Sequence, residues 1–284
     1  LLPDREFAVA SFFFEPSTRT KFSFSLAAQR INSLVIDFET SKSSLTKGES
    51  FYDTLKTFDA QDVDLAVIRS SESHFLSQYK ENCPLKIINA GDGENQHPTQ
   101  ALLDFFTLTE LYGDISGKTI GIIGDVAHSR VAKSLIDLAT YFHVNIALCG
   151  PSHFVDSKIC EENHVREIKS VDELISQVDF IYCLRVQNER HDKEFSFDSQ
   201  SYVQEYGLTL ERLKKNQKKN QPFIILHPGP VNVGIELSEN IVSSSNNNDV
   251  VKYLPHEQVK HSLPLRMALL HAVLNGDKNN SRTL

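Results

Sequence analysis

The chain has 284 residues, of which 40% are hydrophobic and 23% are charged, and its formal net charge is −8. This length and composition suit one large or two ordinary globular domains with apolar cores. The acidic balance, without a basic tail or a basic stripe mixed with aromatic residues, argues against a nucleic-acid partner. No run of ~18 uncharged apolar residues occurs, so no membrane-spanning helix is expected.

The cysteines and histidines indicate neither a disulfide framework nor a metal site. Cys83, Cys149, Cys160 and Cys183 are scattered without a CxxC pair, which is typical of reduced cysteines in a cytoplasmic protein. The eleven histidines form no HExxH or similar pattern, so no metal is expected. No signal-peptide pattern occurs, so secretion is not expected. Because Leu1 stands only a few residues before a predicted strand, we expect further residues to precede it in the natural protein.

Short β-rich apolar runs alternate with helical patterns in the first third of the chain. The predicted strands are Glu6–Phe14, Leu34–Phe38, Asp64–Arg69 and Leu85–Asn89. The predicted helices between them are Thr18–Arg30, Ser50–Gln61 and Ser73–Asn82. This βαβαβαβ order predicts a parallel sheet covered by helices.

A second α/β run follows a long predicted helix, Pro98–Tyr112, which starts with proline and ends before Gly113. The strands predicted in this run are Thr119–Gly124, Asn145–Cys149, Asp179–Leu184 and Phe223–Leu226. The predicted helices are Ser129–Phe142, Val171–Gln177 and an apolar final helix, Leu263–Leu274. Ser243–Asp249 is expected to be a polar surface loop. We therefore predict two α/β domains, each a parallel sheet flanked by helices, with bounds 1–98 plus 263–284 and 99–262.

The segment FFFEPSTRT (12–20) places hydroxyl groups and a guanidinium directly after a predicted buried strand. In a parallel sheet, ligands bind at the carboxyl ends of strands, where the N-terminus of the next helix favours an anion. Ser17, Thr18 and Thr20 offer hydroxyl donors, and Arg19 offers a planar guanidinium suited to phosphate. The alternative is a simple helix N-cap. A cap does not explain an arginine in the first helical turn, so we favour an anion site.

Arginines recur at the ends of predicted strands or in the turns after them, namely Arg19, Arg69, Arg130 and Arg185. Cations gathered there in an acidic chain would attract anionic ligands. A single exposed arginine could equally be an ordinary solvated charge, so the argument depends on the whole set together with His97.

The segment TIGIIGDVAHSR (119–130) also allows a dinucleotide-binding loop. Its GxxG spacing departs from GxGxxG, and the next strand ends without the acidic residue that binds a ribose, which argues against this alternative.

Seven segments occur in a recognisable order: FFEPSTRT (13–20), SSLTKGES (43–50), VIRS (67–70), NAGDGENQHPTQ (89–100), GDVAHSR (124–130), LRVQNER (184–190) and HPGPVNVGIE (227–236). Together they resemble the aspartate and ornithine carbamoyltransferase family over nearly the whole chain. The last three look like the aspartate-specific members. Ornithine-specific members carry a cysteine-containing HCLP segment where this chain has HPGP (227–230).

The resemblance implies transfer of the carbamoyl group of carbamoyl phosphate to L-aspartate, an early step of pyrimidine biosynthesis, without a metal, an organic cofactor or a covalent intermediate. The residues that it implies for carbamoyl-phosphate binding are Ser17, Thr18, Arg19, Thr20, Ser44, Arg69, His97, Gln100, Pro228 and Gly229. Those implied for aspartate binding are Lys47, Arg130, Arg185, Gln187 and Gly229. Those implied to be catalytic are Arg19, Thr20, Lys47, Arg69 and His97. We name no protein general base, because the phosphate can take the proton of the amine.

The resemblance also implies an assembly. Ser44 and Lys47 would reach the site of a neighbouring subunit in a homotrimer. Without the resemblance, these residues would indicate only an ordinary polar loop. Glu15 and Arg190 would pair when the two domains close around the substrates. Regulatory subunits or other pathway enzymes are possible partners. Two alternatives stay open, an ornithine-type enzyme and a catalytically silent scaffold, and the intact STRT, HPTQ and RVQ segments argue against the scaffold.

Overall fold

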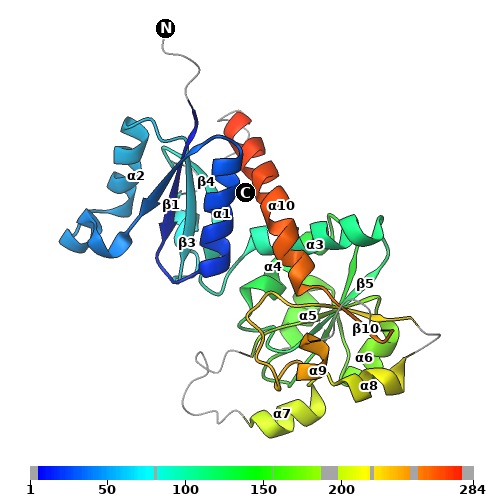
Figure 1. Cartoon of the computed structure of the whole chain (residues 1–284). Helices are drawn as coiled ribbons and strands as arrows, with labels where there is room; N and C mark the ends of the chain where they lie inside the picture. The colour runs from blue at the N-terminus through cyan, green and yellow to red at the C-terminus, as the bar shows by residue number, and fades with distance from the viewer. Residues whose placement is uncertain are drawn as a thin grey trace. The chain divides into compact units, whose positions relative to one another are not determined.

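The computed structural model describes residues 6–79, 82–155, 157–186, 198–217, 221–243 and 249–276. The chain divides into two compact units, Leu1–Leu103 with Val259–Leu284, and Asp104–Gln258. We call them unit 1 and unit 2 and describe each by itself. The divisions fall inside two long helices, α3 (Pro98–Tyr112) and α10 (Pro255–Asn275), so each of these helices contributes residues to both units (Figure 1).

Unit 1 contains a parallel sheet in the strand order β2-β1-β3-β4. Its strands are β1 (Ala8–Phe13), β2 (Leu34–Phe38), β3 (Leu65–Ser70) and β4 (Lys86–Asp92). The sequence predicted all of these strands, because each is a short apolar run bounded by polar residues. The parallel pairing confirms the fold class predicted for this half of the chain.

Helices cover both faces of this sheet. Ala10 and Phe12 of β1 pack in one buried cluster with α2 (Phe51–Ala60). Val9, which points the other way, packs in a second cluster with α1 (Thr18–Arg30) and the C-terminal part of α10. Figure 1 shows α2 on one side of the sheet and α1 with α10 on the other. The two-residue period of β1 therefore supplies both cores of unit 1.

Unit 2 contains a second parallel sheet, in the order β10-β9-β8-β5-β6-β7. Its strands are β5 (Thr119–Ile123), β6 (Asn145–Cys149), β7 (Arg166–Glu167), β8 (Phe180–Cys183), β9 (Phe223–Leu226) and β10 (Val251–Tyr253). The sequence predicted β5, β6, β8 and β9. It missed β7 and β10, which have 2 and 3 residues, too few to display a periodic pattern.

The helices of unit 2 also differ in how well the sequence revealed them. Besides parts of α3 and α10, they are α4 (Arg130–Ala139), α5 (Ser157–Asn163), α6 (Val171–Gln177), α7 (Ser199–Glu205), α8 (Leu210–Asn216) and α9 (Glu239–Val242). The sequence predicted α3, α4 and α6. It missed α5, α7, α8 and α9, which have seven residues or fewer and show at most two turns of the helical period. Helix α6 is equally short, but its apolar Val171, Leu174 and Ile175 recur at the helical spacing i, i+3, i+4. Side chains of α6, α8 and α9 pack with the sheet in one buried cluster.

Two of the predicted helices need correction. The helix expected over Ser73–Asn82 is wrong: the structure has a short 3-10 helix, η3 (Phe75–Tyr79), there. His74 has a φ of +63°, a left-handed conformation that an α-helix does not continue through. The final helix begins at Pro255 rather than at Leu263, because its first two turns are polar and hydropathy did not reveal them. The polar loop expected over 243–249 lies largely outside the described residues.

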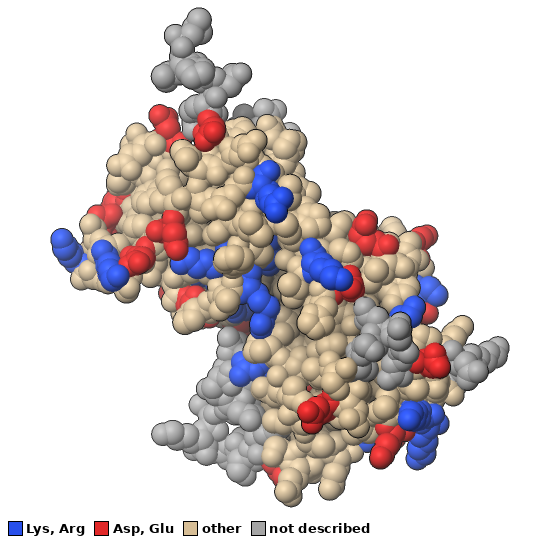
Figure 2. Space-filling view, viewed as in Figure 1, with Lys and Arg blue, Asp and Glu red and all other residues tan. Residues whose placement is uncertain are grey.

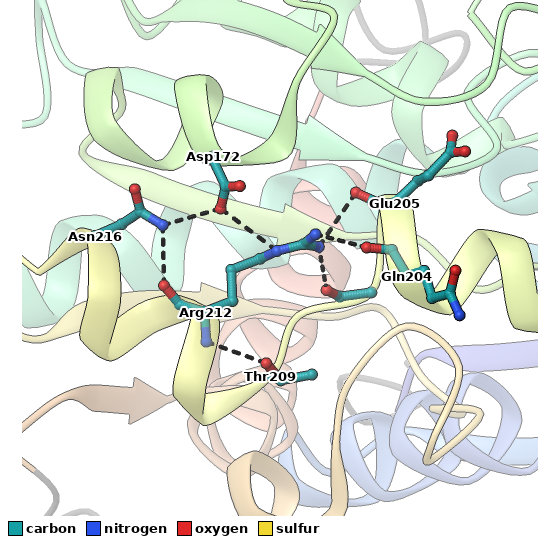
Figure 3. A network of polar contacts seen from close by, with 7 residues as sticks. Asp172, Gln204, Glu205, Thr209, Arg212 and Asn216 are labelled. Atoms are coloured by element: carbon teal, nitrogen blue, oxygen red, sulfur yellow. Dashed lines mark hydrogen bonds and ion pairs between the residues drawn. The ribbon is translucent and has the colours of Figure 1, made fainter.

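Arg212 connects three helices of unit 2 (Figure 3). From α8, its guanidinium donates to the backbone carbonyls of Gln204 (2.7 Å), Glu205 (3.2 Å) and Gly207 (2.6 Å) at the end of α7. It also pairs with Asp172 of α6 at 3.4 Å. Because the last carbonyls of a helix have no intrahelical partners, Arg212 stabilises the C-terminus of α7.

Candidate active site

Each sheet reverses its strand order at one position, which is where parallel α/β sheets bind ligands at their carboxyl edge. The reversal falls between β1 and β3 in unit 1 and between β5 and β8 in unit 2. Ser17 to Thr20 follow β1, and Arg69 is the penultimate residue of β3. In unit 2, Arg130 follows β5 and Arg185 follows β8. The structure therefore places the arginines singled out in the sequence at the switch points of the two sheets.

Helix α1 begins directly after Ser17. Ser17 has the extended backbone of an N-cap residue (φ −156°, ψ 102°), but its side chain makes no capping hydrogen bond. No acidic residue lies in the first turn of α1, so the positive end of the helix dipole has no side-chain counter-charge there. Thr18 and Arg19 are exposed, and Thr20 is buried. This helix start therefore presents N–H groups, hydroxyls and a guanidinium, the groups that bind an anion.

Arg69 links three groups of unit 1. Its Nε donates to Glu15 Oε1 at 2.6 Å, and both side chains of this ion pair are largely buried, at 12% and 16% exposure. Its Nη1 lies 3.4 Å from Thr20 Oγ1 and 3.5 Å from His97 Nε2. The carboxylate of Glu15 thus holds one edge of the guanidinium, while the other edge lies beside a hydroxyl and an imidazole.

His97 and Gln100 lie at the start of α3. The carbonyl of His97 accepts the N–H groups of Gln100 (3.0 Å) and Ala101 (3.3 Å). The side chains of His97 and Gln100 are buried, at 5% and 9% exposure. The structure therefore brings His97 together with Thr20 and Arg69, three residues that are far apart in the sequence.

Ser44 and Lys47 form the ends of an exposed 3-10 helix, η2 (Ser44–Lys47). Leu45 packs on the core of unit 1, whereas Ser44 and Lys47 are exposed. Among the described residues, neither makes a hydrogen bond with the group around Arg69. Both side chains are accessible from solvent, and the structure does not bring them to that group.

The predicted residues of unit 2 lie in three loops after neighbouring strands. Arg130 is the first residue of α4 and is buried, and Arg185 is half-buried two residues after β8. Pro228 and Gly229, also half-buried, follow β9. Because β5, β8 and β9 are adjacent and parallel, these loops share one edge of the sheet. Two further predicted residues, Gln187 and Arg190, lie outside the described residues.

Glu236 has a role that the sequence analysis missed. Its Oε1 accepts the N–H of Val186 at 2.7 Å, and its Oε2 accepts the N–H of Asn232 at 2.7 Å. The side-chain amide of Asn232 donates to the same carboxylate at 2.9 Å and to the carbonyl of Val186 at 3.0 Å. Burial raises the pKa of Glu236, against the opposing effect of these hydrogen bonds. Glu236 therefore fixes the backbone next to Arg185, and the only signal in the sequence was an acidic residue at the end of HPGPVNVGIE.

In the described part of the chain, no group of three or more His, Cys, Asp or Glu side chains is placed to hold a metal ion. No described helix is long and apolar enough to cross a membrane. Acidic and basic side chains are interspersed over the face shown in Figure 2.

Two parallel α/β units with arginines at their switch points are typical of the class of proteins that bind anionic ligands. The model of the aspartate/ornithine carbamoyltransferase carbamoyl-P binding domain matches residues 4–110, and that of the Asp/Orn binding domain matches residues 116–273. The chain belongs to the aspartate/ornithine carbamoyltransferase family, which confirms the resemblance seen in its motifs.

The individual relatives and solved structures that the chain resembles are aspartate carbamoyltransferases. The chain is 40% identical over 275 residues to the aspartate carbamoyltransferase catalytic subunit of Enterococcus faecalis, covering 96% of this chain and 85% of that protein. It is 41% identical over 269 residues to that of Staphylococcus epidermidis, covering 94% and 86%. Among solved structures, aspartate transcarbamoylase from Trypanosoma cruzi in complex with carbamoyl phosphate and aspartate is similar, with a TM-score of 0.79 at 28% identity over 94% of this chain and 84% of that chain.

Proposed function

We propose that this chain is an enzyme that joins carbamoyl phosphate and L-aspartate into N-carbamoyl-L-aspartate and phosphate. The amine nitrogen of aspartate attacks the carbamoyl carbon, and the bond from that carbon to the phosphate oxygen breaks. The phosphate leaves with the electron pair of this bond and takes a proton from the amine. The relatives at 40% and 41% identity are aspartate carbamoyltransferases, which supports aspartate rather than ornithine as the acceptor. By the family resemblance, this reaction would be an early step of pyrimidine biosynthesis.

The observation that carries this proposal is the contact of Arg69 with both Thr20 and His97. A carbonyl oxygen beside these groups would be polarised by a guanidinium, a hydroxyl and an imidazole. These donors already point to the place where negative charge develops in the transition state. They stabilise that charge without having to reorganise during the reaction, which lowers the activation barrier. The ion pair with Glu15 holds the guanidinium in its orientation.

The remaining carbamoyl-phosphate contacts follow from the helix start and from the family resemblance. Ser17, Thr18, Arg19 and Thr20 would bind the phosphate through hydroxyls, N–H groups and a bidentate guanidinium. The hydroxyl of Ser17 makes no capping hydrogen bond to its own helix, which leaves it available to the phosphate. Gln100, with the backbone at Pro228 and Gly229, would bind the carbamoyl amino group.

Aspartate carries two carboxylates, and the proposed contacts to them are cationic or amide groups. By resemblance these contacts are Lys47, Arg130, Arg185, Gln187 and Gly229. The position of Arg130 and Arg185 at the switch point of unit 2 supports the assignment, because ligands bind there in parallel sheets. The two carboxylate-binding arginines would also orient the amine for attack.

The assembly belongs to the proposal as well. We place the chain in a homotrimer with shared sites, in which Ser44 and Lys47 serve a neighbouring subunit. Their exposure on η2 supports this role, because both side chains are accessible to a second chain. A cytoplasmic location and an association with regulatory or pathway enzymes stay predictions.

The test compares two acceptors. Formation of the ureido product from carbamoyl phosphate is measured with L-aspartate and, separately, with L-ornithine. We expect turnover with aspartate alone. Turnover with ornithine would overturn the assignment of unit 2, and no turnover with either acceptor would favour the silent scaffold.

A matched pair of variants links this activity to the anion site. Arg19→Ala is expected to lower kcat/KM by about 10²–10³, because a charged donor to the phosphate is lost. Arg30→Ala removes an exposed arginine from the last turn of the same helix and should leave kcat/KM unchanged. Equal effects of the two variants would contradict the phosphate site.

A further inference from the structure

A chain of buried hydrogen bonds in unit 2 reaches the turn 227–230. Gln258, in the first turn of α10, accepts the N–H of His227 on its Oε1 at 3.1 Å. Its Nε2 donates to Asp104 Oδ1 at 2.6 Å. The other carboxylate oxygen of Asp104 accepts the hydroxyl of Tyr182 at 2.7 Å. Gln258 therefore connects the turn to a buried carboxylate on α3.

The side chain of His227 extends this chain to Gly229. Its Nδ1 lies 2.8 Å from the backbone nitrogen of Gly229, whose N–H donates to it. Because a backbone N–H can only donate, Nδ1 carries the lone pair and the proton of the neutral ring lies on Nε2. Gly229 has a φ of +67°, a conformation that favours glycine. Both amide hydrogens of the turn are thus held, one by Gln258 and one by the imidazole.

The side chains of this network are buried. Tyr182, Asp104 and Gln258 are 0%, 1% and 3% exposed. Burial and the charge of Asp104 hold the pKa of Tyr182 well above its usual value, so its hydroxyl stays protonated and donates. A fully bonded buried network fixes its members, whereas the loss of one partner leaves a polar group that must shift or admit water.

We propose that Gln258 and Asp104 are positioning residues of the transfer reaction, which place the backbone at Pro228 and Gly229 through His227. The inference rests on the proposed function, in which this backbone contacts the carbamoyl amino group and aspartate. Gln258 and Asp104 act through the turn and need no contact with substrate. A displacement of about 1 Å at a substrate contact can cost about a hundredfold in rate, which is why such support matters.

A reciprocal exchange tests the network. In Gln258→Glu, a carboxylate faces Asp104 and the bond between the two side chains is lost. In Asp104→Asn, either Gln258 or Tyr182 loses its acceptor. The double variant restores all three of these bonds and reverses only the one between positions 104 and 258: the amide at 104 donates to the carboxylate at 258, which still accepts the N–H of His227, and the amide oxygen at 104 still accepts the hydroxyl of Tyr182. We expect each single variant to lower kcat by about tenfold to a hundredfold, and the double variant to recover most of the loss.

Two comparisons separate positioning from general damage. Gln177→Glu makes the same change at an exposed glutamine whose amide donates to Glu173 at 3.0 Å, and it should retain wild-type kcat. Binding of inorganic phosphate, which uses the helix start in unit 1, should change less than about twofold in every variant. If the single variants lose kcat and phosphate binding in parallel, the positioning role is overturned.

Amide hydrogen exchange gives a readout that does not depend on activity. The segment 227–230 carries amide hydrogens only on His227 and Gly229, because Pro228 and Pro230 have none. Both are expected to exchange faster in the single variants and at the wild-type rate in the double variant. Wild-type exchange and kcat in either single variant, or a double variant no better than the worse single one, would overturn the inference. Absence of turnover with aspartate in the wild-type protein would instead overturn the proposed function, while exchange still reports whether the network holds the turn.

Discussion

At the scale of single residues, the arrangement around Arg69 shows how one side chain can serve structure and chemistry together. Its Nε is held by Glu15 at 2.6 Å, which leaves Nη1 beside Thr20 and His97. Only a planar, branched cation can bond to a carboxylate along one edge and to other groups along another. The identity of this residue, and not its charge alone, therefore matters for the proposed site.

Arg69→Lys tests this point. The compact ammonium group cannot reach Glu15 and the carbonyl position at once, so kcat is expected to fall by about 10²–10³. Steady-state kinetics with carbamoyl phosphate and aspartate measure the loss. Arg30→Lys, the same substitution at an exposed position of α1, is the control and should keep wild-type kcat. Equal kcat in both variants would show that charge alone suffices at position 69.

Glu236 predicts a pH dependence of stability. Burial raises its pKa in the folded protein, so the folded state binds more protons than the unfolded chain above the usual pKa of a glutamate. Its contribution to stability is therefore full at low pH and is lost as pH rises through the folded pKa. The free energy of unfolding of the wild type, minus that of Glu236→Gln, should be smaller at about pH 8 than at about pH 5. Urea unfolding at the two pH values measures this difference, and the same substitution at the exposed Glu239, Glu239→Gln, is the control. A difference that grows with pH would contradict the assigned cause.

At the scale of elements, two helices that both follow a hydroxyl residue at the N-cap differ in how that residue bonds. Thr209 caps α8, because its Oγ1 accepts the N–H of Arg212 at 3.1 Å. Ser17 stands at the same position before α1 but makes no such bond. A hydroxyl that makes no bond to its own helix is available to a ligand, as proposed for Ser17.

Alanine substitutions at these two caps should have opposite effects. Thr209→Ala is expected to lower the free energy of unfolding by about 1 kcal/mol and to leave KM for carbamoyl phosphate unchanged. Ser17→Ala should change stability by less than about 0.5 kcal/mol and raise that KM by about tenfold, because a hydrogen bond to a charged ligand is lost. Urea unfolding measures the free energy of unfolding, and steady-state kinetics on the same preparations measure KM for carbamoyl phosphate. A loss of stability in Ser17→Ala equal to that in Thr209→Ala would mean that Ser17 is an ordinary cap.

At the scale of the whole molecule, the proposed assembly rests on the family resemblance, and two exposed residues of unit 1 make it testable. Ser44 and Lys47 are accessible on η2, and among the described residues they form no hydrogen bond with the group around Arg69. In the proposed assembly, a second copy of the chain receives them. Each site of a closed ring would then combine Arg19 from one chain with Lys47 from its neighbour.

Mixing two nearly inactive variants tests this arrangement. Arg19→Ala and Lys47→Ala alone should each have about 1% or less of wild-type kcat/KM. When they are unfolded together and reassembled in equal amounts, activity should return to about a quarter of the wild-type value, because random mixing places both intact residues at that share of shared sites. The molar mass measured by light scattering should correspond to a trimer. No recovery in reassembled hybrids would show that both residues act within one chain.

The local sequence pattern was enough to predict most of the strands and the long helices. The apolar runs of β1, β2, β3 and β4 and the signals around α1 and α3 depend on neighbours a few residues away, so the sequence displays them directly. Short helices such as α7, and the left-handed His74 that prevents the predicted helix over 73–82, leave no such periodic trace. For these segments, packing outweighs local preference.

The sequence by itself determined the fold class, the family and the kinds of groups at the candidate site, because these are properties of periodicity and of motifs in order. Only the tertiary structure decided which groups meet. Glu15 reaches Arg69 across 54 positions, and Gln258 reaches Asp104 across 154. Contacts at such separations depend on strand order and helix packing, which no local pattern specifies. For that reason the supporting residues Asp104, Glu236 and Gln258 became visible only once the chain was folded.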